Sequence, residues 1–113
     1  MDDLRRLLPL SAQQFHILLS LSDADRHGYG IILEVAERTN QVLKMGTGTL
    51  YTAIARLLEL NLVAETKTDE PRRRTYRITA AGRQVLRLEA ARLDALVRQA
   101  RTKGITIPAK HDH

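Results

Sequence analysis

The clearest chemical potential of the chain lies in the segment DEPRRRTYRIT, which contains the consecutive arginines Arg72, Arg73 and Arg74. A guanidinium group donates paired hydrogen bonds to carboxylate or phosphate oxygens. Charge is also uneven along the chain, because residues 1–70 hold 7 Lys/Arg against 10 Asp/Glu whereas residues 71–113 hold 11 against 3. This asymmetry indicates a polyanion as partner, although a solvated basic helix face would give the same composition.

The remaining side chains offer little chemistry other than anion binding. The chain has no cysteine, which excludes disulfides, cysteine zinc sites and thiol catalysis. His16 and His27 have no third residue at metal-ligand spacing, and His111 and His113 lie in a tail without periodicity. No phosphate-binding loop, nucleophile elbow or metal-ligand cluster occurs. We therefore expect no metal, no cofactor and no enzymatic activity.

The length of the chain bounds its organisation. A chain of 113 residues is expected to form one folded unit around one buried core. The apolar stretch within the N-terminal segment MDDLRRLLPL is too short for a signal peptide, and no other run approaches the ~20 apolar residues of a membrane span. These features and the missing cysteines predict a cytoplasmic protein with no membrane contact.

Hydrophobic spacing predicts three helices in the first sixty residues. Ser11 and Gln14 stand at the spacing of a capping box, which predicts a first helix that ends at about Leu21. Apolar residues resume helical spacing over about 28–38, which predicts a second helix. A third helix begins near Thr47 with the segment TGTLYTAIARLLEL.

The third helix has two distinct faces. Its apolar residues repeat at i, i+4, i+7 and i+8, namely Leu50, Ile54, Leu57 and Leu58. Its opposite side is a narrow face of small polar groups plus one cation, formed by Thr49, Thr52 and Arg56. Asn61 follows the helix and tolerates the left-handed backbone of a helix end.

The rest of the chain predicts a hairpin and a long helix. Two alternating segments, 62–67 and 74–78, are expected to form a two-stranded hairpin, because the intervening Asp-Glu-Pro is typical of a turn. Thr79 can cap a last helix that reaches about Arg101. At about 1.5 Å per residue this helix would be about 34 Å long, which is the width of a small domain.

The last helix carries a candidate dimerisation seam. Its apolar residues recur at steps of four, three, four and three, as in a coiled coil: Leu86, Ala90, Leu93, Val97 and Ala100. The seam could pack wholly on its own domain, but the length of the helix favours protrusion and contact with a second copy.

This order of elements predicts a mainly α fold with a small β-hairpin. It corresponds to a winged helix-turn-helix plus a long C-terminal dimerisation helix. We expect the winged-helix domain at residues 1–78, the dimerisation helix at 79–103 and a flexible tail at 104–113. In a winged helix the third helix reads the major groove of DNA, and the hairpin tip reaches phosphates or the minor groove.

Three segments resemble, in order and separation, the signatures of the PadR family of transcriptional regulators. They are HGYGI from His27, GTGTLYTAIARLLE from Gly46 and RRRTYRITAAGR from Arg72, within a resemblance over about residues 10–100. The resemblance implies a winged-helix DNA-binding domain, with the hairpin arginines as the wing. It also implies a two-fold dimer built by the last helix with the first, as in members with a single C-terminal helix. A small molecule or other cue would alter this dimer, but no effector can be named.

We therefore interpret the chain as a homodimeric transcriptional repressor that binds double-stranded DNA at a palindromic operator. The contacts are expected from residues 44–56 and from the wing at 68–76. The expected DNA-binding residues are Lys44, Thr47, Thr49, Tyr51, Thr52, Arg56, Arg72, Arg73 and Arg74. The alternative interpretation is a winged-helix module that binds another protein and has no specific DNA site.

The three tyrosines have different expected roles. Tyr51 lies between the apolar and polar faces of its helix, so core packing with a solvent-facing hydroxyl and a phosphate contact both fit. Tyr29 is expected to pack between helices, and Tyr76 to brace the wing. Gly28 and Gly30 flank Tyr29, where a missing Cβ allows either close backbone approach or an unusual dihedral angle.

Overall fold

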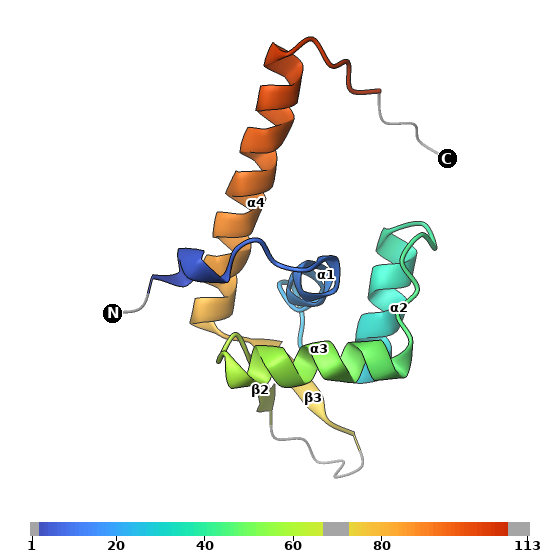
Figure 1. Ribbon diagram of the computed structural model, residues 1–113. Helices are drawn as coiled ribbons and strands as arrows, with labels where there is room; N and C mark the ends of the chain where they lie inside the picture. The colour runs from blue at the N-terminus through green and yellow to red at the C-terminus, as the bar shows by residue number, and fades with distance from the viewer. Residues whose placement is uncertain (1–2, 67–72, 109–113) are drawn as a thin grey trace.

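The computed structural model describes residues 3–66 and 73–108 and has a winged-helix fold with a long C-terminal helix, as the sequence predicts (Figure 1). In these described ranges, a short 3-10 helix, η1, is followed by four α-helices and three strands. Their bounds in chain order are η1 (Leu4–Leu7), α1 (Ala12–Ser20), β1 (Arg26–His27), α2 (Gly28–Arg38), α3 (Thr47–Glu59), β2 (Val63–Thr66), β3 (Thr75–Ile78) and α4 (Ala80–Thr102). Within the described residues, no helix is both long and apolar enough to cross a bilayer.

The first three helices share one apolar core. Helix α1 begins with the predicted capping box, in which Ser11 Oγ accepts a hydrogen bond from Gln14 N at 3.1 Å and Gln14 Oε1 accepts one from Ser11 N at 3.0 Å. Helix α3 crosses below α1 and α2 in Figure 1. The fully buried side chains of these helices include Ile17, Leu18, Ile31, Leu50 and Ile54. Of the predicted apolar stripe of α3, Leu50, Ile54 and Leu57 are buried and Leu58 is partly buried.

The sheet has three strands, so the predicted two-stranded hairpin is incomplete. β2 and β3 pair antiparallel with Val63 opposite Ile78, and β1 pairs with the other edge of β3 with Arg26 opposite Tyr76. β1 contains only two residues, which is too short for an alternating pattern to be recognised in the sequence. Its pairing depends on the fold, because β3 must already lie beside it.

The start of α4 is anchored on the turn between α3 and β2. Asn61 has a φ of 59°, which confirms the left-handed helix end. The Thr79 hydroxyl donates to Asn61 O at 2.7 Å and accepts a hydrogen bond from Gly82 N at 3.0 Å. A Cβ atom on Gly82 would lie 2.1 Å from Leu62 O and 2.8 Å from Ile78 Cγ1. Glycine is therefore required where α4 crosses the backbone of this turn.

Helix α4 leaves the core after its first three turns. Val85 and Glu89 are buried, whereas the C-terminal half stands clear of the other helices in Figure 1. The protrusion expected from the length of this helix is therefore present.

We expect Gly82→Ala to lower the free energy of unfolding by at least about 2 kcal/mol, because the added methyl group would overlap a backbone carbonyl that cannot move freely. Gly48→Ala is the matched control, since no atom lies within 4 Å of a Cβ there. This control should raise the stability by up to about 1 kcal/mol through its higher helix propensity. Urea denaturation measures both, and changes of the same sign would contradict the packing described for α4.

Candidate nucleic-acid interface

Helix α3 exposes a face of small side chains. Its apolar residues Leu50, Ile54 and Leu57 are buried, so the opposite side must face solvent. The outermost line, at steps of four, three and four, consists of Gly48, Thr52, Ala55 and Glu59, all of which are exposed. Gly48, Thr52 and Ala55 have short side chains, which allow close approach of another surface to the helix backbone, whereas the longer Glu59 lies at the C-terminal end of the line.

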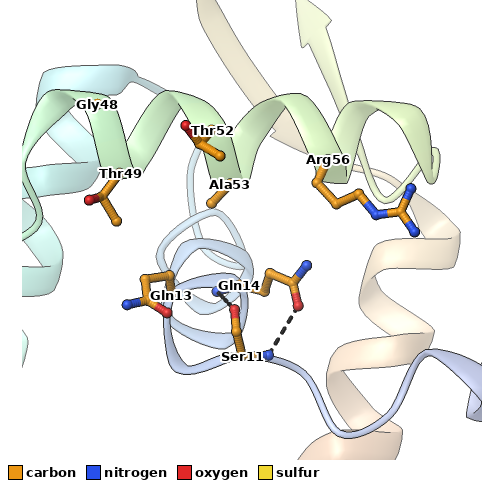
Figure 2. A pocket seen from close by; sticks show the side chains of 8 residues that line it. All are labelled: Ser11, Gln13, Gln14, Gly48, Thr49, Thr52, Ala53 and Arg56. Carbon is orange, nitrogen blue, oxygen red and sulfur yellow. Dashed lines mark hydrogen bonds between the residues drawn. The ribbon is translucent and has the colours of Figure 1, made fainter.

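One edge of α3 forms an open groove with the N-terminal end of α1 (Figure 2). The groove has a volume of about 530 Å³. Its lining residues are Ser11, Gln13, Gln14, Gly48, Thr49, Thr52, Ala53 and Arg56. The predicted polar face of Thr49, Thr52 and Arg56 therefore lies along this groove. Gln14 uses its amide oxygen in the capping box, and its amide nitrogen points toward α3 in Figure 2.

Sequence reasoning missed the contribution of α1 to this groove. The capping box located the start of α1, but neither Gln13 nor Gln14 was expected to lie beside the polar face of α3. Their position depends on the crossing of two helices that share a core, and no local pattern in the sequence encodes it. The only available signal was the amide-rich start of the helix itself, which is common in helices of any function.

The other edge of α3 meets the start of α2 and the base of the wing. Here a hollow of about 180 Å³ is lined by His27, Gly28, Tyr29, Tyr51, Arg73 and Arg74. Tyr51 is 48% exposed, so the core-packing alternative does not describe it. The expectation for Tyr29 was wrong, because Tyr29 is 62% exposed. Helix α2 buries Gly28, Ile31, Val35 and Ala36, and Tyr29 in its first turn is not part of this buried set.

Tyr76 is buried on β3 and supports the base of the wing. Burial raises the pKa of the Tyr76 hydroxyl, and the nearby Tyr51 and Glu65 add to this effect. Arg74 also lies against Tyr76 and forms an ion pair with Glu65 at 3.6 Å. The expected role of Tyr76 therefore agrees with its position.

The other predicted contact residues lie around this surface. Lys44 is exposed in the loop before α3, and Thr47 is the exposed first residue of the helix. Arg73 and Arg74 are exposed before β3, whereas Arg72 lies outside the described residues. Within the part of the chain that the structure describes, no three His, Asp or Glu side chains gather as a metal site requires.

The predicted seam on α4 is mostly exposed. Leu86 is partly buried and packs against the core, whereas Ala90 is exposed. Further along, Leu93 is 38%, Leu96 46% and Val97 41% exposed, and Ala100 is half-buried. Leu96 was absent from the predicted seam and widens it. This apolar surface lies on the part of α4 that stands away from the core.

A buried carboxylate connects α4 to the start of α1. Glu89 is 2% exposed and accepts a hydrogen bond from Leu10 N at 2.8 Å. Arg92 Nη2 donates to Glu89 Oε2 at 3.1 Å, and Arg92 Nε bonds the other carboxylate oxygen. The hydrogen bonds from Arg92 and Leu10 lower the pKa of Glu89 and outweigh the opposing effect of burial. The residue before the α1 cap is therefore held by α4.

This architecture agrees with a comparison with known families. A family model described as the transcriptional regulator PadR-like family matches residues 17–88. The chain belongs to this family. The match confirms the PadR resemblance of its three signature segments.

Relatives of this PadR-like chain include two curated proteins and many solved structures. The chain is 36% identical over 77 residues to an uncharacterised 37.1 kDa protein of transposon TN4556 from Streptomyces fradiae. That match covers 68% of this chain but only 21% of the Streptomyces protein. A transcriptional regulator from Clostridium thermocellum is 27% identical with a TM-score of 0.71, and the match covers 83% of this chain and 90% of that one.

The PadR-like fold also matches a PadR structure from Bacillus subtilis in complex with operator DNA. That chain is 20% identical with a TM-score of 0.63, and the match covers 93% of this chain and 55% of that one. At this identity the similarity concerns the fold.

We expect Glu89→Gln to lower the stability of this PadR-like protein at pH 7 by about 1–3 kcal/mol, because a buried charged hydrogen-bond acceptor is lost. The pKa of Glu89 is lowered in the folded state, so its stabilisation is complete above the ordinary value of 4.5 and is lost as the pH falls through the folded-state pKa. The difference from wild type should therefore shrink below about pH 4.5. Urea denaturation across this range measures it, with the exposed Glu37→Gln as control. A constant difference from pH 7 to pH 3 would contradict this role.

Proposed function

We propose that the protein is a transcriptional repressor that binds duplex DNA sequence-specifically, as a homodimer on a palindromic operator. One observation carries the proposal. Gly48, Thr52 and Ala55 of α3 lie between two polar edges, with Arg73 and Arg74 at one edge and the side-chain amides of Gln13 and Gln14 at the other. A duplex contains matching features, because its major groove is bounded by two phosphate backbones.

The dimensions favour insertion of α3 into the major groove. An α-helix with side chains is about 10–12 Å across, and the major groove of B-form DNA is about 12 Å wide. Gly48, Thr52 and Ala55 keep α3 at the narrow end of this range. The helix backbone would then lie close to the base edges.

The polar face of α3 supplies groups for sequence recognition. The hydroxyls of Thr49 and Thr52 form hydrogen bonds with either donors or acceptors on base edges, and the Arg56 guanidinium suits guanine. We expect Lys44, Thr47, Arg73 and Arg74 to contact phosphates, which fix orientation without reading sequence.

The exposed surface on α4 supports a dimer. Leu93, Leu96 and Val97 form an apolar surface on a helix that projects from the domain, which is typical of helix pairing. A two-fold dimer would present two copies of α3 to the DNA, and such symmetry fits a palindromic operator. Repression follows if the bound dimer occupies the site that a polymerase requires.

The competing function is a winged-helix module that binds another protein. It would also use an exposed helix and a charged wing, but it would release no counterions from DNA. The salt dependence of duplex binding therefore distinguishes the two functions.

We expect replacement of both Arg73 and Arg74 by alanine to flatten the salt dependence of duplex binding. The slope of log K against log salt should fall by about 0.9 for each phosphate that this pair of arginines neutralises in each protomer. The control variant replaces Arg101 and Lys103 by alanine, which removes two positive charges as well, but at the C-terminal end of α4. Fluorescence anisotropy across a salt series measures the slopes. Equal slopes for wild type and the wing variant, or equal changes in both variants, would contradict the wing contact.

We expect Val97→Glu to convert the dimer to a monomer, because the variant places a carboxylate on the apolar surface of α4. Ala91→Glu is the control, since Ala91 is exposed on the opposite side of the same helix. Sedimentation velocity measures both variants. A monomeric wild type, or a Val97→Glu variant that sediments as wild type does, would contradict the proposed interface.

A further inference from the structure

The hollow beside Tyr51 brings together groups from three separate parts of the chain. His27, Gly28 and Tyr29 come from the start of α2, Tyr51 from α3, and Arg73 and Arg74 from the approach to β3. At about 180 Å³ the hollow suits a small group and is too small for a large cofactor. Its position at the edge of α3 makes it part of the surface proposed above.

The charge of the hollow favours an anion. Two of its six lining residues are arginines and none is acidic. Glu65 lies nearby and pairs with Arg74 at 3.6 Å, but both side chains are largely exposed. Exposed ion pairs contribute little, so Arg74 exchanges this partner for another anion at small cost.

The position of the Tyr51 hydroxyl depends on Gly28. A Cβ atom on Gly28 would lie 2.4 Å from Tyr51 Oη and 2.9 Å from Tyr51 Cζ, and 3.2 Å from Leu50 Cδ2. Gly28 does not have a positive φ, so the glycine is needed for space and not for an unusual dihedral angle. Any larger residue would push the ring of Tyr51 out of its place. The hydroxyl is thus held at the hollow by the backbone of α2.

We infer that this hollow is a phosphate-binding notch, in which the Tyr51 hydroxyl and the guanidiniums of Arg73 and Arg74 hold one backbone phosphate of the duplex beside α3. Gly28 is a positioning residue that holds the tyrosine there. The inference rests on the proposed DNA binding and deepens it. A phosphodiester supplies oxygen acceptors for a phenol and for guanidinium groups, and its negative charge is attracted by the two arginines.

The notch has a defined consequence for recognition. A phosphate contact carries no base information, so it should contribute equally on every duplex. The phenol is neutral, so its loss should weaken binding without changing the salt slope. This combination separates Tyr51 from Arg73 and Arg74, whose loss changes the slope.

The first test compares Tyr51→Phe with wild type by fluorescence anisotropy, on a duplex of random sequence and on one selected by the protein. We expect about tenfold weaker binding on both duplexes, with an unchanged salt slope and an unchanged melting temperature. If wild type binds DNA but Tyr51→Phe binds both duplexes equally well, the notch is overturned while the proposed function stands. If wild type binds neither duplex, both the notch and the proposed function are contradicted.

The second test is a double-mutant cycle on Gly28. Gly28→Ala should weaken binding about tenfold in the wild-type background, because it displaces the hydroxyl. In a Tyr51→Leu background, which lacks the outer ring atoms that meet the new Cβ, the same change should have less than a twofold effect. Gly30→Ala is the control on the same helix, since a Cβ there has no neighbour closer than 3.4 Å.

An equal loss from Gly28→Ala in both backgrounds would overturn the positioning role. If Gly28→Ala fails to fold, its recovery in the Tyr51→Leu background, measured by thermal denaturation, supports the predicted steric contact. The absence of such recovery would overturn it. Tyr51→Phe tests the phosphate contact in either case, because it adds no atom to the fold.

Discussion

The burial of one stripe of α3 is the constraint on which the other features depend. Leu50, Ile54 and Leu57 lie in the shared core, and helix geometry then dictates which side chains face outward. Rotation of α3 would bury Thr52 or expose Leu50, and either change is unfavourable. The packing of the core therefore fixes the surface that the helix presents, although no core residue belongs to that surface.

The neighbours of α3 complete this surface from both sides. α1 contributes the side-chain amides of Gln13 and Gln14 at one edge. The base of the wing and the start of α2 form the notch at the other edge. The start of α1 is itself held by Glu89 of α4, which hydrogen-bonds Leu10 N. Glu89 is therefore one contact through which a shift of α4 would reach the start of α1 beside the groove. This contact provides a physical link between the proposed dimer helix and the proposed DNA surface.

Local patterns in the sequence predicted the features that depend on local physics. The capping box at Ser11, the apolar stripe of α3 and the left-handed Asn61 each follow from neighbouring residues. The winged-helix order and the PadR family were also predictable, because the signature segments are specific. The position of Arg73 and Arg74 beside α3 was predictable from the winged-helix order, in which the hairpin lies next to the third helix.

The missed features depend on contacts between distant segments. β1 has two residues and exists because β3 lies beside it. Tyr29 is aromatic but exposed in the first turn of α2, where it lines the hollow beside Tyr51. The burial of Glu89 requires the amide of Leu10, 79 positions away in the chain. At Gly28 the sequence left two explanations open, close backbone approach and an unusual dihedral angle. The contact with Tyr51 identifies close approach. Such pairings leave no periodic signal in a single sequence.

The most direct measurement of the DNA surface is amide chemical-shift mapping of the ¹⁵N-labelled protein with a duplex selected by the protein from a random pool. We expect the largest changes at Gly48, Thr52 and Ala55 of α3, at Gln13 of α1 and at Arg74 of the wing. The amides at the C-terminal end of α4, from Gln99 to Thr102, should stay unchanged. Changes concentrated on α4, or an α3 face that stays unperturbed by bound duplex, would contradict the proposed DNA surface.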